Sequence, residues 1–178
     1  VAGQPPGGPL RVLVVSQEAA APREVLPYLK LLLQQKDIEL TLKFRPYRDG
    51  CEQWRLQHAP DILRQGNLKI VRGSMQEAIK EASVVVGGYS TGVLEAVLQL
   101  KAPVYFRTQK WGDYYSLKEH ESQSFFAESP EELVQKIHAV QSVSVEALKE
   151  LREQYFGDPY KNGSAWVVDQ LEQKLRGR

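Results

Sequence analysis

The residues best suited to do chemistry lie in one short turn, the hexapeptide 87–92 with the sequence GGYSTG. A run of valines precedes this turn, and apolar residues at helical spacing follow it. A strand that leads into a helix through small residues leaves backbone amides at the helix start, where the helix dipole favours negative charge. We therefore expect Ser90 and Thr91 to hold a phosphate group. Gly88 and Gly92 would let the ligand approach the backbone closely.

A purely structural role for the same residues stays open. Serine and threonine are favoured at helix N-caps, where each contributes about 1 kcal/mol. Glu95 follows Thr91 by four residues, so the two share one helix face. Glu95 is interpreted either as a carboxylate that accepts hydrogen bonds from a ribose, or as a solvated acid near the helix start.

A second group of candidate residues follows an apolar run at 38–44. Arg45 and Arg48 bracket Pro46 and Tyr47. The planar guanidinium of arginine binds two oxygens at once, which suits a phosphate or carboxylate. A tyrosine in this place can stack on a base. The alternative is that both arginines are solvated and that Tyr47 only covers the sheet edge.

Several kinds of site are not indicated by the sequence. The three histidines lack metal-ligand spacing, and no Cys/His cluster or acidic pair of the Asp-x-Asp kind occurs, so we expect no metal cofactor. The Gly-x-Gly-x-x-Gly pattern typical of dinucleotide sites is absent. A net charge of +1 argues against a nucleic-acid partner. No catalytic residue is identified.

The elements that must position the turn alternate between strand and helix. This pattern, with continuous apolar strands, predicts an α/β fold with a doubly wound, mostly parallel sheet and helices on both faces. In such a fold 16–18, 45–49 and 87–92 meet at the carboxyl ends of the strands, where ligands bind. Strands are expected at 11–15, 40–44, 68–71, 84–86 (inside the sheet) and 104–106, with an edge strand at 124–127.

Helices are expected between these strands and after them. Capping patterns begin helices at Ser74 and Ser129. The segment 51–65 is left undecided, because Pro60 interrupts a short helical pattern. The aromatic loop 111–115 is interpreted as a lid or, preferably, as a patch that packs on another domain. Further helices are expected at 23–35, 145–155 and 164–175.

Length and composition fit one soluble domain. The chain has 178 residues, 42% hydrophobic and 25% charged. Residues 1–9 are rich in Gly and Pro and are expected to form a disordered linker or an artificial remnant, with residues 10–178 as the single domain. The one cysteine, Cys51, fits a reducing compartment. The chain is interpreted as a piece of a longer protein.

The run from Ala82 to Phe106 resembles the carboxyl-terminal, donor-binding half of GT-B glycosyltransferases. It is most similar to bacterial enzymes with cytidine-linked donors: sialyltransferases, Kdo transferases and the related glycerolphosphotransferases. Ser90-Thr91 matches their Ser-Ser or Ser-Thr pair, which holds the nucleotide phosphate. Their His-Pro pair has no histidine here, because Arg45 stands before Pro46. The Glu95 position could match the second of the paired glutamates found in many nucleotide-sugar enzymes, but Gly87 stands in place of the first.

The resemblance implies a Rossmann-like domain that binds a nucleotide-sugar, with a CMP-linked donor favoured. The site would comprise Arg45, Tyr47, Arg48, Gly88, Ser90, Thr91, Gly92 and Glu95. The partner would be an amino-terminal acceptor-binding domain of the same parent chain, absent here, so this piece should bind rather than catalyse. The parent would build a bacterial surface polysaccharide in the cytoplasm, with peripheral association at the inner membrane face as an option. The alternative is a doubly wound module that binds a nucleotide or a protein without chemistry.

Overall fold

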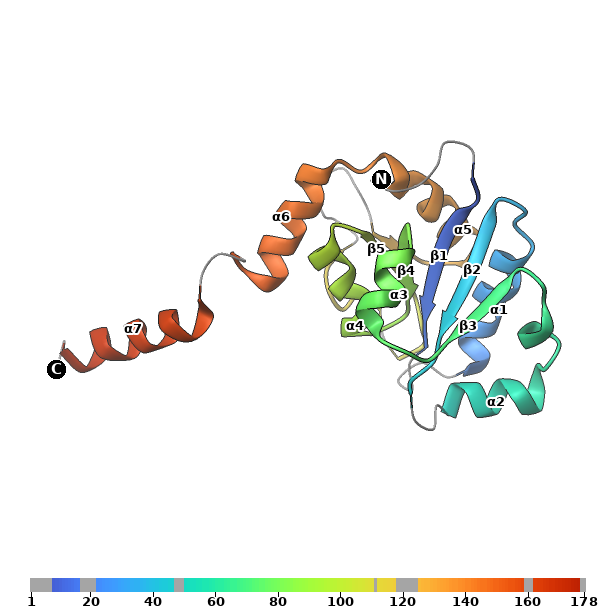
Figure 1. Ribbon diagram of the computed structural model, residues 1–178, viewed down its shortest axis with the longest axis horizontal. Coiled ribbons are helices and arrows are strands. Elements are labelled where there is room, and N and C mark those ends of the chain that lie inside the picture. The colour runs from blue at the N-terminus through green and yellow to red at the C-terminus, as the bar shows by residue number, and fades with distance from the viewer. Residues whose placement is uncertain are drawn as a thin grey trace.

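The computed structural model describes residues 8–16, 22–46, 50–110, 112–117, 125–158 and 162–176. Within these ranges strands and helices alternate along the chain (Figure 1). Residues 1–7 of the expected linker lie outside the described residues. So do Tyr47, Arg48 and Trp111, and the expectations for these three side chains stay predictions.

Six strands form one parallel sheet in the order β3-β2-β1-β4-β5-β6. The predicted fold class is therefore confirmed, and the five strands predicted at 11–15, 40–44, 68–71, 84–86 and 104–106 are all present. The connections change direction between β1 and β4, which is the switch point where doubly wound folds bind ligands. The strands are Leu10–Val15 (β1), Ile38–Lys43 (β2), Leu68–Val71 (β3), Val84–Gly87 (β4), Ala102–Phe106 (β5) and Phe126–Ala127 (β6).

The central strands are buried on both faces, as their continuous apolar sequences predict. Every residue of β4 and β5 is buried. β4 lies inside the sheet, with Val84 paired in register to Val12 of β1 and to Ala102 of β5. The short strand β6 lies at the sheet edge beside β5, which confirms the predicted edge strand for its last two residues.

Helices pack on both faces of the sheet. α1 and α5 contact each other on one face, and α3 and α4 lie on the other, where a 3₁₀ segment, η2, follows α4 and contacts α6 (Figure 1). The helices are Pro22–Leu33 (α1), Gly50–His58 (α2), Met75–Glu81 (α3), Thr91–Leu94 (α4), Pro130–Ala139 (α5), Val145–Phe156 (α6) and Gly163–Arg176 (α7); the 3₁₀ segments are Ile62–Arg64 (η1), Glu95–Gln99 (η2) and Val140–Ser142 (η3).

Serine caps fix the starts of α3, α5 and α6. The hydroxyl of Ser74 accepts a hydrogen bond from the Glu77 amide, and that of Ser129 accepts one from the Glu132 amide at 3.1 Å. Ser144 does the same for α6. The predicted capping patterns at Ser74 and Ser129 are thus confirmed. The undecided segment 51–65 is helical in two pieces, α2 and η1, which Pro60 separates.

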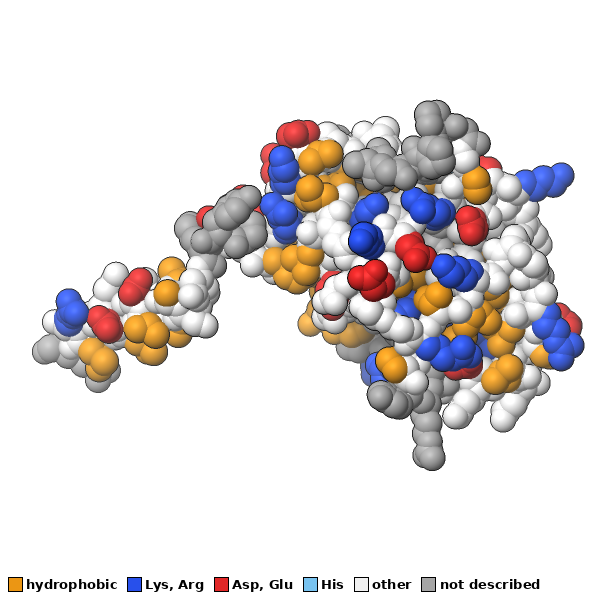
Figure 2. Space-filling model, in the orientation of Figure 1, with side chains coloured by type: hydrophobic (Ala, Val, Ile, Leu, Met, Phe, Trp, Pro, Cys, Tyr) orange, Lys and Arg blue, Asp and Glu red, His pale blue; other side chains and the backbone are white. Residues whose placement is uncertain are grey.

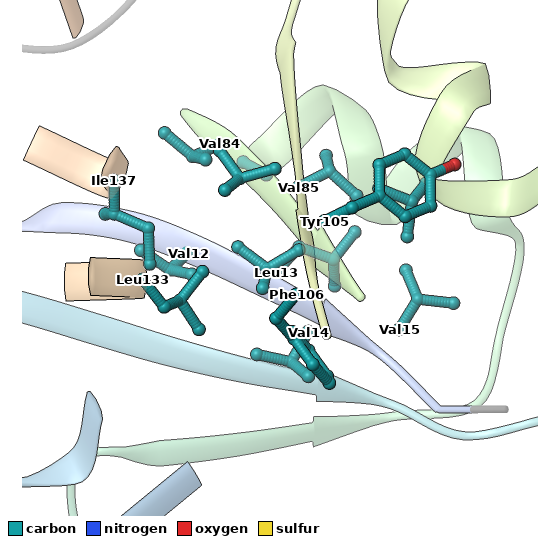
Figure 3. Close-up of a cluster of buried hydrophobic side chains, with 14 of the residues drawn as sticks. Val12, Leu13, Val14, Val15, Val84, Val85, Tyr105, Phe106, Leu133 and Ile137 are labelled. Atoms are coloured by element: carbon teal, nitrogen blue, oxygen red, sulfur yellow. The ribbon is translucent and has the colours of Figure 1, made fainter. Parts of the chain in front are cut away.

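The core lies where the buried strands meet the helices. Figure 3 shows part of this cluster, with Leu133 and Ile137 of α5 and valines of β1 and β4. Tyr28 of α1 stacks on Phe106 of β5 with ring centroids 4.3 Å apart. The Tyr105 ring belongs to the same cluster, but its hydroxyl points away from these side chains (Figure 3). The Tyr105 hydroxyl reaches the turn before α4.

α7 is unlike the other long helices, because none of its described residues is buried. It extends away from the rest of the molecule, and hydrophobic side chains gather on it (Figures 1 and 2). Val167, Val168, Leu171 and Leu175 are exposed and recur at the spacing of a helical stripe about 100° wide. The predicted helix at 164–175 is therefore present, with its apolar stripe uncovered.

Candidate functional site

The turn between β4 and α4, residues 87–92, lies at the switch point beside β1, and we call it the Ser90 turn. Ser90 is the N-cap of α4, and its hydroxyl accepts a hydrogen bond from the Gly92 amide at 3.2 Å. Its carbonyl accepts hydrogen bonds from the Val93 amide and, at 2.7 Å, from the Tyr105 hydroxyl. Thr91 is exposed at the first helical position. Ser90 is therefore the residue that caps α4, and the Thr91 hydroxyl takes no part in the cap.

The helix after this turn is shorter than the sequence pattern suggests. α4 makes only one α-helical turn, after which the backbone tightens into η2. Leu100 ends η2 in the left-handed conformation with φ 53°, and the Lys101 amide reaches back to the Ala96 carbonyl at 3.0 Å. These bonds form a Schellman-type end. A dipole built from one α-helical turn is small, so phosphate binding here would depend mainly on local amides and hydroxyls.

Glu95 keeps the expected relation to Thr91. The Glu95 amide donates to the Thr91 carbonyl, so the two residues are one helical turn apart. The Glu95 side chain is partly buried. The spacing that motivated a phosphate at Thr91 and a ribose at Glu95 is therefore present, while contact with a ligand stays a prediction.

Packing accounts for two of the glycines that flank the turn. A Cβ on Gly87 would lie 2.6 Å from Cγ2 of Val93. A Cβ on Gly92 would lie 2.8 Å from Cε of Met75 and 3.8 Å from Cγ1 of Val15. The sequence suggested that Gly92 leaves room for a ligand, and the structure shows that it leaves room for α3. Gly88 is buried.

A pocket of about 350 Å³ lies beside this turn, at the carboxyl ends of β1, β2 and β3. We call it the edge pocket. Met75 and Val15, the side chains that a Cβ on Gly92 would approach, are among its walls, so the edge pocket and the Ser90 turn adjoin. Its lining residues are Val15, Ser16, Lys43, Phe44, Arg45, Pro46, Gly73, Ser74 and Met75.

The edge pocket includes one residue that the sequence predicted, Arg45, and others that it did not. Lys43 is the most informative of these, since it is only 5% exposed although lysine is rarely buried. Its ammonium donates a hydrogen bond to the Phe44 carbonyl at 2.7 Å. The sequence does show that a lysine ends this apolar strand. That the lysine is buried follows only from the neighbouring strands.

Further cations surround the floor of the edge pocket. The guanidiniums of Arg55 and Arg72 lie 5.6 and 6.0 Å from the Phe44 ring centroid. Arg72 also pairs with Glu52, and this hydrogen bond raises the pKa of Arg72. Among the described residues, four cations thus surround the end of β2, and Glu52 is paired with one of them. The cations are Lys43, Arg45, Arg55 and Arg72. This surplus of positive charge favours an anionic ligand.

Aromatic rings gather on the other side of the Ser90 turn. Tyr89 makes an edge contact with Tyr114 at 4.8 Å and lies parallel to Tyr115 at 6.0 Å between ring centroids. Tyr115 in turn contacts Tyr105 and Tyr155. Hydrogen bonding to Tyr114 raises the pKa of Tyr89, whereas burial raises that of Tyr105. The aromatic loop 111–115 therefore packs, in its described part, on this chain's own tyrosines.

Another hollow, of about 270 Å³, lies on the face of β1, β2 and β3. Arg11, Glu39, Lys69 and Glu81 stand around it. We call it the face pocket. It is lined from the middle and the amino ends of the strands, away from the Ser90 turn. It is therefore not where a doubly wound fold binds its ligand.

Among the residues that the structure describes, no three His, Cys, Asp or Glu side chains gather in a way that could hold a metal ion. No helix in the described part of the chain is both long and apolar enough to cross a bilayer.

Solved structures share this fold. The kitacinnamycin glycotransferase superposes with a TM-score of 0.59 at 16% identity, over 97% of this chain and 45% of that one. The catalytic domain of cholesterol-α-glucosyltransferase from Helicobacter pylori gives 0.54 at 18% identity, over 82% and 95%. The UDP-GlcNAc 2-epimerase from Neisseria meningitidis, bound to UDP-GlcNAc, gives 0.54 at 11% identity, over 94% and 45%.

At these identities the likeness concerns the fold alone: a Rossmann-like half of the GT-B type. This chain spans less than half the length of two of the three proteins. No protein-family model and no curated protein matches the sequence.

Proposed function

We propose that the edge pocket and the Ser90 turn together bind a nucleotide-sugar, and that this chain is the donor-binding half of a glycosyltransferase. The observation that carries the proposal is that Met75 and Val15 stand around the place where a Cβ of Gly92 would lie. Through these two side chains, a basic pocket at β1, β2 and β3 adjoins a polar helix start at β4. A nucleotide needs both features: cations and donors for phosphate, and apolar walls for a base.

The proposed contacts follow from this arrangement. Ser90, Thr91 and Gly92 contact the phosphate, with Gly88 beneath the turn, and Glu95 contacts the ribose. Arg45 binds a second charged group of the donor, together with Arg48 and Tyr47. In transfer, an acceptor oxygen forms a bond to the anomeric carbon while the bond from that carbon to the phosphate oxygen breaks, and the turn stabilises the leaving phosphate.

Two classes of donor fit the proposal. The resemblance of the run from Ala82 to Phe106 favours a cytidine-linked sugar, as in enzymes of bacterial surface polysaccharides. The solved epimerase holds a uridine-linked sugar. The acceptor would bind to an amino-terminal domain of the parent chain, in the cytoplasm or at the inner membrane face.

A binding role without transfer is the second candidate. One observation favours it for this chain alone: the described residues that line the edge pocket include no Asp, Glu or His. General acid–base catalysis of a transfer needs such a group within hydrogen-bond reach. The chain would then bind a nucleotide, and the chemistry would depend on groups from another domain.

The test separates binding from capping at the Ser90 turn. Thr91→Ala should leave the melting temperature nearly unchanged, because Ser90 and not Thr91 caps α4. It should weaken nucleotide affinity about tenfold to a hundredfold in calorimetric titration, because a charge-assisted hydrogen bond contributes about 1.5–3 kcal/mol. Glu95→Gln should weaken affinity for nucleotides and nucleosides alike.

Ser144→Ala is the matched control, since it removes a helix cap far along the chain from the turn. It should lower stability by about 1 kcal/mol and leave affinity unchanged. If both Thr91→Ala and Glu95→Gln bind nucleotides as the unmodified chain does, the site assignment is wrong.

A further inference from the structure

Lys43 is a buried cation at the end of β2, on the face of the sheet that the edge pocket occupies. It pairs in register with Val15 of β1 and Val71 of β3. Its side chain lines the edge pocket, and its ammonium donates to the Phe44 carbonyl at 2.7 Å. A buried ammonium is costly unless polar groups surround it. Lys43 thus brings a cationic hydrogen-bond donor to the wall of the edge pocket.

The chemistry of an ammonium restricts what can lie against it. Its N–H groups only donate, whereas a base edge presents acceptors at some atoms and donors at others. The walls beside Lys43 are largely apolar: Val15, Phe44, Pro46 and Met75. Apolar walls suit the flat faces of a base better than a sugar covered with hydroxyl groups. The group that reaches Lys43 should thus be a base, with an acceptor toward the ammonium.

The separation between the two parts of the site agrees with this placement. β2 and β4 are separated by β1 alone, so their ends are roughly 10 Å apart. This is comparable to the length of a nucleoside. A phosphate at the Ser90 turn would therefore leave the base, rather than a neighbouring phosphate, at the end of β2.

A base that enters a pocket edge-first leads with the substituent opposite its glycosidic nitrogen. In uracil and guanine this substituent is a carbonyl oxygen, and in cytosine and adenine it is an amino group. The carbonyl accepts a hydrogen bond from an ammonium, whereas the amino group can only donate.

On this basis we propose that Lys43 is a specificity-determining residue, which selects donors with a keto base, uracil or guanine, over donors with an amino base. The inference rests on the proposed function, because it requires the edge pocket to bind the base of a nucleotide. It goes beyond that function by naming the class of base and the residue that selects it.

The experiment is a calorimetric titration of the whole chain with UDP, CDP, GDP and ADP, and with uridine and cytidine at higher concentration. UDP should bind about tenfold to a hundredfold more tightly than CDP, the range for one hydrogen bond to a charged group. GDP should likewise bind more tightly than ADP. The preference should persist for the nucleosides, because it does not depend on phosphate.

Two variants assign the preference to Lys43. Lys43→Met keeps the length and burial of the side chain but removes the donors, so UDP and CDP should bind nearly equally. Lys43→Gln can donate or accept, so it should also lose the preference while retaining affinity for CDP. Lys69→Met is the matched control, because Lys69 is a lysine that lines the face pocket. It lies on β3, two residues before Val71. Lys69→Met should leave the preference unchanged.

The outcomes distinguish the two proposals. If no nucleotide binds to the folded chain, the proposed function fails. If nucleotides bind but CDP equals or exceeds UDP, the inference about Lys43 is wrong and the proposed function stands. An equal loss of UDP and CDP affinity in folded Lys43→Met would also overturn it, because Lys43 would then bind phosphate. Circular dichroism and melting temperature show whether each variant is folded.

Discussion

At the scale of single residues, the glycines of the Ser90 turn determine how closely helices approach the strands. Gly87 meets a stiff, β-branched neighbour, Val93, whereas Gly92 meets the flexible end of Met75. A methionine can move its terminal methyl group, but a valine has few alternative rotamers. The two glycines should therefore differ in how well they tolerate a methyl group.

Gly87→Ala should lower the free energy of unfolding by about 1–3 kcal/mol, because its Cβ would overlap with Val93. Gly92→Ala should lower the free energy of unfolding by less than Gly87→Ala does. Gly66→Ala is the control, since a Cβ there would meet no atom within 4 Å. Urea unfolding of the three variants measures the difference. Equal values for Gly87→Ala and Gly66→Ala would contradict the packing account.

The sequence predicted some of the site residues because their signals are local. Ser90 precedes a helix, and Thr91 and Glu95 are one helical turn apart. Both features could be predicted from the sequence alone. Lys43 could not be recognised in this way, because its burial depends on β1 and β3, which flank β2. The packing role of Gly92 likewise depends on Met75, which belongs to a different helix.

At the scale of elements, β5 supports the Ser90 turn through the hydroxyl of Tyr105. That hydroxyl donates to the Ser90 carbonyl, and burial raises its pKa well above the usual value for tyrosine. Burial also raises the pKa of Tyr115 and Tyr155 in the same group. The neutral phenol is therefore part of the folded state.

The stability of the chain should fall in alkaline solution. Since the folded-state pKa of Tyr105 is raised, its contribution is fully present below about pH 10, the ordinary tyrosine value. It is lost as the pH rises further, because the unfolded chain then releases a proton that the folded chain keeps. Urea unfolding between pH 8 and 11.5 measures this loss. Tyr105→Phe should show a smaller loss, and a titration of Tyr105 at the ordinary value would contradict the prediction.

The sequence predicted strands better than it predicted the helix after the Ser90 turn. Continuous apolar runs such as β4 and β5 indicate buried parallel strands, whatever their neighbours. The apolar spacing after residue 92 fits an α-helix and a 3₁₀ segment almost equally well over two turns. The tighter form results from the left-handed end at Leu100, which the sequence does not mark with a glycine.

At the scale of the whole molecule, α7 and the sheet domain should be energetically separate. No residue of α7 is buried, whereas α6 buries Leu148 and Leu151. Deleting residues 162–178 should therefore shift the melting temperature by less than about 3 °C, equivalent to about 1 kcal/mol. Leu151→Ala should cost about 2–5 kcal/mol as a buried control. A large loss on deleting α7 would mean that its apolar stripe is covered in solution.

The chain alone should bind a nucleotide-sugar without transferring it, because no acidic side chain or histidine is found among the described lining residues of the edge pocket. Incubation with radiolabelled UDP- and CMP-sugars and with simple acceptors should give no product above the blank. Transfer to an acceptor by the chain alone would contradict this prediction, and it would place the catalytic group within these 178 residues.

The central claim is that a nucleotide binds where the edge pocket meets the Ser90 turn. The most direct measurement is a titration of ¹⁵N-labelled chain with UDP and CDP, followed by amide chemical shifts. Saturable shifts should concentrate at Ser16, Gly73, Thr91 and Gly92, on both sides of the switch point. Shifts concentrated at Arg11 and Glu39 of the face pocket, or no saturable shift with any nucleotide, would contradict the claim.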